Sequence, residues 1–139
     1  LYRTKVSGIS FAFGVVSMGN PHAVCLVQRE QLPLVGTIGP ALQACGAVPE
    51  GVNVGLLTVY SLKQAALRVF ERGVGETLAC GSGASAACAV AHRAGLLTDQ
   101  AEFQMRGGRL LMQAGNDGHV LLTVPASEVF EGKISIQGE

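Results

Sequence analysis

Short runs of β-branched and apolar residues, separated by glycine and proline corners, dominate the pattern of the chain. Two such runs, residues 9–17 and 23–27, flank a Gly-Asn-Pro-His corner at 19–22 and predict two strands. Five more strands are predicted on the same grounds, at residues 52–60, 65–71, 101–106, 109–113 and 119–124. Residues 133–136 predict one further short strand near the end.

One stretch, from about residue 81 to residue 94, predicts a buried helix. It is rich in alanine, which favours helix, and Arg93 and Gly95 supply a cation in the last turn and a terminating glycine. Small apolar residues lie on nearly every side, so we expect the sheet to enclose this helix completely. A shorter apolar helix is expected at residues 41–45, with Pro40 as its first residue. The predicted class is α/β (α+β), with a curved, mostly antiparallel sheet or barrel wrapped around one central helix.

Length and composition indicate one globular domain. The chain has 139 residues, of which 48% are hydrophobic and only 14% charged, which excludes intrinsic disorder. Ten basic residues balance ten acidic ones without forming a basic stripe, so we expect no nucleic-acid partner. The longest apolar stretch, residues 84–91, is too short to span a bilayer, and no signal peptide is recognisable. We therefore expect a cytoplasmic protein without a membrane partner.

The cysteine and histidine spacings do not resemble a metal site. No C-x-x-C pair occurs, and the three histidines lack zinc-type spacing, so no metal is expected. In a reducing cytoplasm the thiols are expected to be free. Cys25 and Cys88 lie in apolar runs and are interpreted as core residues.

The chemically informative stretch is the glycine-rich loop that leads into the alanine-rich helix, with Cys80 at the helix start. Unpaired N–H groups and the positive end of the helix dipole favour a thiolate there. The same N–H groups, around Gly81 to Gly83, are suited to hold a carboxylate or phosphate. A thiolate beside such an anion site is suited to removing a proton from the α-carbon of an amino acid.

Two other interpretations of this stretch remain open from the residues alone. Cys80 could be an ordinary small residue at a helix start, with the glycines present for close packing. Alternatively, the stretch could be a generic phosphate-binding loop, although it lacks both G-K-[ST] and the G-x-G-x-x-G spacing.

Three motifs resemble the diaminopimelate epimerase family. The run E-R-G-V-G-E-T-L-A-C-G-S-G-A-S-A at 71–86 resembles the second cysteine motif of that family. S-M-G-N-P-H at 17–22 and G-V-N-V at 51–54 are similar to two further family segments, and similarity continues to residues 130–132. The resemblance covers essentially the whole chain; Ser85 departs from it, because many relatives carry cysteine there.

The resemblance implies a cofactor-independent epimerase that interconverts L,L- and meso-diaminopimelate with two cysteines. One thiolate takes the α-proton while the other thiol donates a proton to the opposite face. Cys80 matches the second catalytic cysteine, and Gly81 and Ser82 match residues that hold the α-carboxylate. No cofactor is implied.

Other site residues are also implied by the resemblance. Asn20, Asn53, Glu71 and Arg72 match substrate-binding positions at the distal end of the substrate, where the Arg72 fork suits a carboxylate. Glu71 and His22 match positions that tune the cysteine pair.

By the same resemblance, the chain is one lobe of the diaminopimelate epimerase-like fold. Residues 1–127 match the C-terminal catalytic lobe without its first strands, and residues 128–139 match a tail that returns to the N-terminal lobe. The family's first cysteine lies in that other lobe, and nothing here resembles its motif. The implied partners are diaminopimelate, the N-terminal lobe and a second copy in a homodimer, near Phe130. We expect little or no activity from this chain alone.

Two other functions are compatible with the sequence. Proline or hydroxyproline racemases also place a cysteine before a glycine-rich helix start, but their substrate has no distal carboxylate or amine, so the E-R-G-x-G-E-T run favours the epimerase. A non-enzymatic anion-binding or interaction module would leave Cys80 inert. Substrate choice tests the first rival, and alkylation of Cys80 tests the second.

Overall fold

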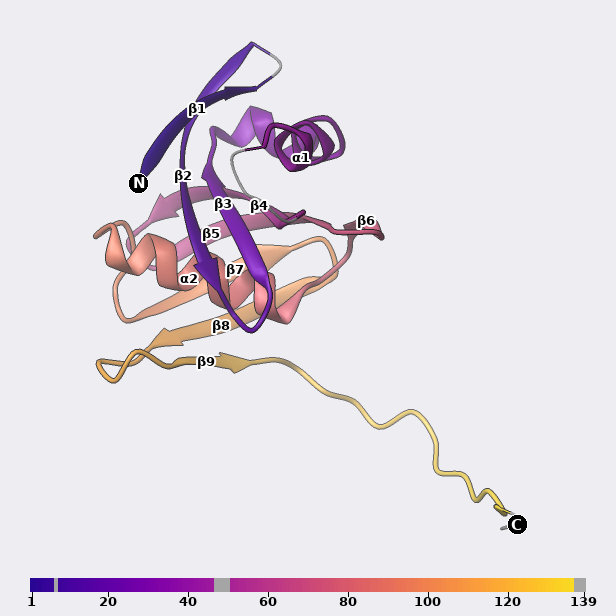
Figure 1. Cartoon of the computed structure of the whole chain (residues 1–139). Helices are drawn as coiled ribbons and strands as arrows, with labels where there is room; N and C mark the ends of the chain where they lie inside the picture. Colours follow the sequence, from indigo (N-terminus) through magenta and orange to yellow (C-terminus); the bar gives the residue numbers. More distant parts are fainter. Residues whose placement is uncertain (7, 47–50, 137–139) are drawn as a thin grey trace.

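The computed structural model describes residues 1–6, 8–46 and 51–136. Within them the chain forms one mixed sheet, two α-helices and a 3₁₀ helix (Figure 1). The helical elements are η1 (Arg29–Leu34), α1 (Val35–Ala44) and α2 (Gly81–Arg93). The strands are β1 (Tyr2–Val6), β2 (Ile9–Ser17), β3 (Pro21–Leu26), β4 (Asn53–Ser61), β5 (Gln64–Glu71), β6 (Gly75–Thr77), β7 (Gln100–Met105), β8 (Gly108–Ala114) and β9 (Val120–Thr123).

The sheet is mostly antiparallel, as predicted. Its order is β1-β2-β3-β4-β5-β7-β8-β9, with the short β6 paired to β5. Two neighbouring pairs, β3 with β4 and β5 with β7, are parallel. The seven strands predicted between residues 9 and 124 are confirmed with small shifts at their ends, whereas β1 and the three-residue β6 were not predicted.

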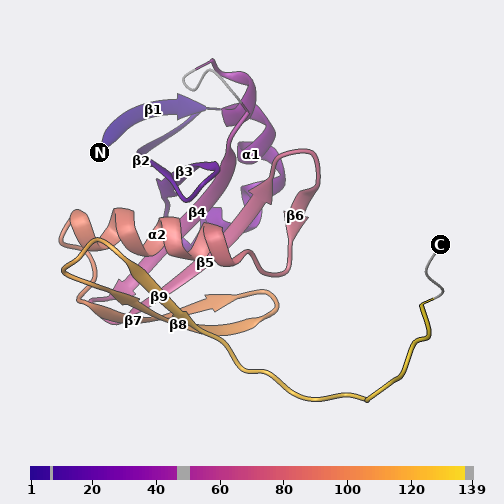
Figure 2. The same cartoon turned by 60° about the horizontal axis from the view of Figure 1, so that its bottom comes forward.

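The two helices cover opposite faces of the central strands (Figure 2). Successive side chains of a strand point to opposite faces. Val24 and Leu57 accordingly pack in the core that contains α2, whereas their neighbours Cys25 and Leu56 pack in the core that contains α1. The central strands are therefore buried on both sides, which explains why β3 and β4 read as continuous apolar runs in the sequence.

Helix α1 is longer than predicted. It begins at Val35 rather than at Pro40, directly after η1, and Pro40 lies in its interior. Val35, Ile38 and Leu42 supply the helical apolar spacing and are buried, so tertiary packing outweighs the helix-breaking residues between them. Pro40 lacks an N–H for the carbonyl of residue 36, but both residues are exposed, so water can bind that carbonyl.

The strand predicted at residues 133–136 is wrong for this structure. From Val124 to residue 136 the chain is extended and exposed and has no strand partner among the described residues. Ile134 and Ile136 are 88% and 86% exposed. The alternation of apolar residues there is real, but no sheet edge lies beside it (Figure 1).

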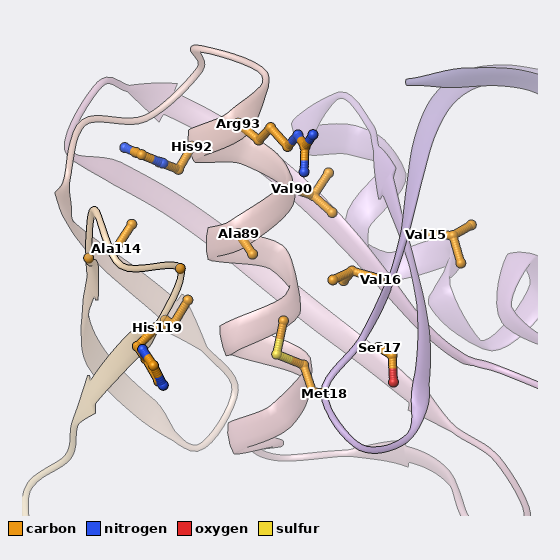
Figure 3. Close-up of a pocket in the computed structure, with 13 residues that line it drawn as sticks. Val15, Val16, Ser17, Met18, Ala89, Val90, His92, Arg93, Ala114 and His119 are labelled. Atoms are coloured by element: carbon orange, nitrogen blue, oxygen red, sulfur yellow. The ribbon is translucent and has the colours of Figure 1, made fainter.

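Among the described residues the sheet does not close into a barrel, and α2 is not enclosed on every side. A groove of about 590 Å³ runs beside α2, between the end of β2 and the turn that leads into β9 (Figure 3). Val16 and Met18 line one wall, Ala89 and Val90 the helix side, and Val120 the other wall. The prediction that the sheet encloses α2 completely is therefore wrong. The helix is buried on most sides and half-exposed along this groove. None of the helices in the described ranges is long and apolar enough to cross a membrane.

Helix α1 approaches β5 so closely that only glycine fits at position 39. A Cβ on Gly39 would lie 2.6 Å from both Cβ and Cγ of Phe70, whereas a Cβ on Gly36 would meet nothing within 4 Å. We expect Gly39→Ala to lower the free energy of unfolding by roughly 1–3 kcal/mol, as overpacking does. Gly36→Ala, the matched control, is expected to raise it by up to about 1 kcal/mol through helix propensity. Urea denaturation measures both; equal effects of the two substitutions would contradict this packing.

Candidate functional site

The predicted site residues gather where three strand ends meet the start of α2. His22 near the start of β3 pairs in register with Asn53 at the start of β4, because these two strands are parallel. Strand β5 runs antiparallel to β4, and the pairing of Val54 with Phe70 brings Glu71, the last residue of β5, beside Asn53. The parallel pair β3–β4 and the antiparallel pair β4–β5 therefore bring together His22 and Glu71, which are 49 positions apart in the sequence.

The side chains of these three residues lie on the face of the sheet that α2 covers. His22 is two residues before Val24, Asn53 four before Leu57, and Glu71 two after Val69; all three of these apolar residues pack in the α2 core. Side chains two or four residues apart on a strand share a face. His22, Asn53 and Glu71 are therefore directed to the side from which α2 begins.

Cys80 is the N-cap of α2. Its backbone is extended, with φ −145° and ψ 106°, and its Sγ accepts a hydrogen bond from the Gly83 N–H at 3.3 Å. The hydroxyl of Ser82 lies 3.5 Å from the same sulfur. The thiol is only 9% exposed, so this helix terminus surrounds the sulfur with polar hydrogens in a mostly buried place.

Glycine at position 83 lets α2 begin tightly against the sheet. A Cβ there would lie 3.1 Å from Cγ2 of Val69 and 3.2 Å from the Cys80 sulfur. The N–H groups of Gly81 and Ser82, in the first turn, have no acceptor within the helix. Gly81 is exposed and Ser82 half-buried, so this turn is open to a ligand with anionic oxygens.

A neutral imidazole is the favoured form of His22. The ring is almost fully buried, and its Nε2–H donates to Asn20 Oδ1 at 3.1 Å. Burial lowers the pKa of His22, and this outweighs the nearby Glu71 carboxylate, which raises it. At neutral pH the ring therefore acts as a hydrogen-bonding group without charge.

Asn53 fixes the start of the loop that carries the cysteine. Its Oδ1 accepts the backbone N–H of Arg72 at 2.9 Å, while the Arg72 guanidinium donates to the Gly51 carbonyl at 3.3 Å and is otherwise exposed. Glu71 accepts a hydrogen bond from the Thr77 hydroxyl at 2.6 Å. The sequence interpretation did not include Thr77 among the site residues. The feature that could have pointed to it is its position in the motif, directly after Glu76 and six residues after Glu71.

The other three thiols lie away from this cluster. Burial raises the pKa of Cys25 to about 12 and that of Cys88 to about 11, whereas Cys45 is exposed. This agrees with the interpretation of Cys25 and Cys88 as core residues. All four are free. The described residues contain no group of three or more side chains arranged to hold a metal ion.

Comparison with known proteins agrees with the motif resemblance. A family model described as diaminopimelate epimerase matches residues 14–129. A diaminopimelate epimerase of Thioalkalivibrio sulfidiphilus is 45% identical over 137 residues, which is 97% of this chain and 49% of that protein. The chain spans about half the length of the curated relatives it matches.

Solved structures share the fold. A predicted epimerase from Pseudomonas aeruginosa is 28% identical, with a TM-score of 0.54 over 91% of this chain and 48% of that one. A hydroxyproline epimerase from Agrobacterium vitis, solved with bound trans-4-hydroxy-L-proline, is 18% identical, with a TM-score of 0.56 over 81% of this chain and 40% of that one. The second similarity concerns the fold alone.

The thiols should differ sharply in reactivity. With iodoacetamide at pH 8, we expect rapid modification of Cys45 and almost none of Cys25 and Cys88, because their raised pKa values keep them protonated and their burial excludes the reagent. Peptide mass spectrometry after a timed reaction measures each site. Modification of Cys25 or Cys88 at the rate of Cys45 would show that these core assignments are wrong.

His22 should make the folded state sensitive to mild acid. Its pKa is lowered in the folded state, so above the unfolded value of about 6.5 neither state is protonated and His22 has no effect. As the pH falls through about 6.5, the unfolded chain binds the proton first, and stability decreases. Urea unfolding between about pH 7.5 and 5.5 should show a larger loss for the native protein than for His22→Gln. Parallel pH profiles would contradict the burial of a neutral ring.

Proposed function

The chain belongs to the diaminopimelate epimerase family, and we propose that it supplies half of an epimerase active site, with Cys80 as one of two acid/base thiols. The proposed reaction converts L,L-diaminopimelate to meso-diaminopimelate without a cofactor. The observation that carries the proposal is the cysteine N-cap of α2, which places a thiol beside unpaired N–H groups at the meeting point of the polar strand ends.

The first turn of α2 is suited to the reacting end of an amino acid. The N–H groups of Gly81 and Ser82 would hold the α-carboxylate. The Cys80 thiolate would take the α-proton, so that the C–H electron pair stays on the α-carbon and spreads onto that carboxylate. The same N–H groups would stabilise the added negative charge. A second thiol would give its proton to the opposite face of the α-carbon, which inverts the centre and leaves one thiol and one thiolate.

The residues around the strand ends are suited to the rest of the substrate. Arg72 has an exposed guanidinium on a backbone fixed by Asn53, and its fork fits a distal carboxylate. Asn20, Asn53 and Glu71 would contact polar groups of that distal end. His22, neutral and bonded to Asn20, would tune the thiols together with Glu71 without adding a fixed positive charge.

The second thiol must come from outside this chain. The two buried cysteines are held protonated, and Cys45 is the exposed C-cap residue of α1, the helix that covers the other face of the sheet. We therefore propose that residues 1–127 act as a C-terminal lobe, and that the tail from residue 128 packs on an N-terminal lobe. Exposed apolar side chains in the tail, such as Phe130, support this and leave room for a contact with a second copy. Free thiols suit a reducing cytoplasm.

A proline or hydroxyproline racemase is the second candidate, since one such enzyme shares the fold. Its substrate has no distal carboxylate, and an exposed Arg72 beside Glu71 would then serve no purpose at the site. The distal polar residues therefore favour diaminopimelate. An anion-binding module without catalysis would not need a mostly buried thiol at the anion site.

We expect epimerase chemistry only when the missing half is restored. The probe is the half of the Thioalkalivibrio sulfidiphilus relative that this chain does not match, expressed separately and mixed with this chain. Incorporation of solvent deuterium at the α-carbons of L,L-diaminopimelate should appear in the mixture and be nearly absent with either part alone. Cys80→Ser should lower exchange by at least about a hundredfold, whereas Cys45→Ser, an exposed control, should not change it.

Two results would oppose the proposal. Full exchange by this chain alone would remove the need for a second thiol. Exchange that is absent from the mixture although the parts demonstrably associate would favour the anion-binding module. Proline in place of diaminopimelate tests the racemase candidate in the same assay.

A further inference from the structure

Beyond the Arg72–Asn53 and Thr77–Glu71 hydrogen bonds, the loop between β5 and α2, which carries Cys80, is held from outside at two further points. We propose that Glu76 and Gly107 are positioning residues, which fix this loop so that the Cys80 sulfur meets the first turn of α2. The inference rests on the proposed function, in that the placement of Cys80 matters because Cys80 acts as the acid/base thiol. Neither residue belongs to the motif positions assigned to substrate or proton transfer.

The first point is an ion pair between β6 and β5. The Arg68 guanidinium donates to both Glu76 oxygens, from Nε to Oε1 at 2.6 Å and from Nη2 to Oε2 at 2.8 Å. Both side chains are about four-fifths buried, and Arg106 approaches the same carboxylate at 3.2 Å. A bidentate ion pair of this kind fixes both the orientation of the two side chains and the distance between them, so it sets the position of β6 on β5.

The second point is a backbone contact from the β7–β8 turn. The Gly107 N–H donates to the Leu78 carbonyl at 2.8 Å. A Cβ on Gly107 would lie 3.1 Å from that oxygen and 3.3 Å from its carbon. Gly107 is outside the left-handed backbone region, so an alanine there would meet no backbone strain of its own. Gly107→Ala therefore changes the approach to Leu78 and little else.

These contacts matter because the loop buries little apolar surface of its own. Val74 and Leu78 are 72% and 60% exposed, so hydrophobic packing cannot define the path of the loop. Leu78 is two residues before Cys80, whose sulfur accepts the Gly83 N–H at 3.3 Å. Moving the Leu78 carbonyl by a few tenths of an ångström would weaken that bond and with it the helix-terminus stabilisation of the thiolate.

The test is the pH profile of Cys80 alkylation by iodoacetamide in this chain, resolved by peptide mass spectrometry. The rate at neutral pH is divided by the plateau rate at high pH, so that a change in access to the sulfur cancels. Gly107→Ala is expected to lower this ratio about two- to fivefold, the size of one helix-terminus interaction. Glu76→Gln should lower it in the same direction, while the rate at Cys45 stays unchanged in both.

The matched control is Glu102→Gln, which breaks the exposed Arg109–Glu102 pair on the same β7–β8 hairpin and should leave the ratio as in the native chain. An unchanged ratio in both Gly107→Ala and Glu76→Gln would overturn the inference, as would an equal decrease in Glu102→Gln. If one variant fails to fold by circular dichroism, the other decides. Absence of deuterium exchange in the mixture with the missing half, while both variants lower the ratio as expected, would instead count against the proposed function itself.

Discussion

Burial of α2 is the constraint on which the rest of the structure depends. A helix made almost wholly of alanine, glycine, serine and cysteine cannot be stable alone in water, because its apolar surface is too small and its terminal amides are unpaired. The curved sheet supplies the missing contacts, and the small side chains let the strands approach closely. The same burial directs the N-terminus of α2 at the ends of β3, β4 and β5. The packing that stabilises the fold is thus the same packing that places the cysteine.

The polar groups around that terminus have partners of their own or are kept neutral. His22 is kept neutral by burial, Glu71 bonds the Thr77 hydroxyl, and the Glu76 carboxylate is paired with Arg68. The Cys80 sulfur accepts the Gly83 N–H at the helix terminus, where the helix dipole is positive. In the proposed function, a substrate carboxylate would bind the neighbouring N–H groups of Gly81 and Ser82 in the same turn, which couples substrate binding to the state of the thiol.

Much of this could be predicted from sequence because it is local. Seven of the strands, the alanine-rich helix and its cysteine cap follow from periodicity and composition. The length of α1 could not, since Gly39 and Pro40 look like helix breakers and the reason for Gly39 is a neighbour, Phe70, that lies far along the chain. The Arg68–Glu76 pair and the Gly107 contact were missed for the same reason, because they depend on which strands pair. The tail shows the converse, because residues 133–136 alternate as a strand does but have no strand partner among the described residues.

The central claim is that the substrate carboxylate and the Cys80 thiol share the first turn of α2. The most direct measurement is the alkylation rate of Cys80 with and without L,L-diaminopimelate, in the chain combined with the missing half of its relative, with Cys45 as internal reference. The account predicts that diaminopimelate slows modification of Cys80 and leaves Cys45 unaffected. Equal rates at Cys80 with and without saturating diaminopimelate would contradict it.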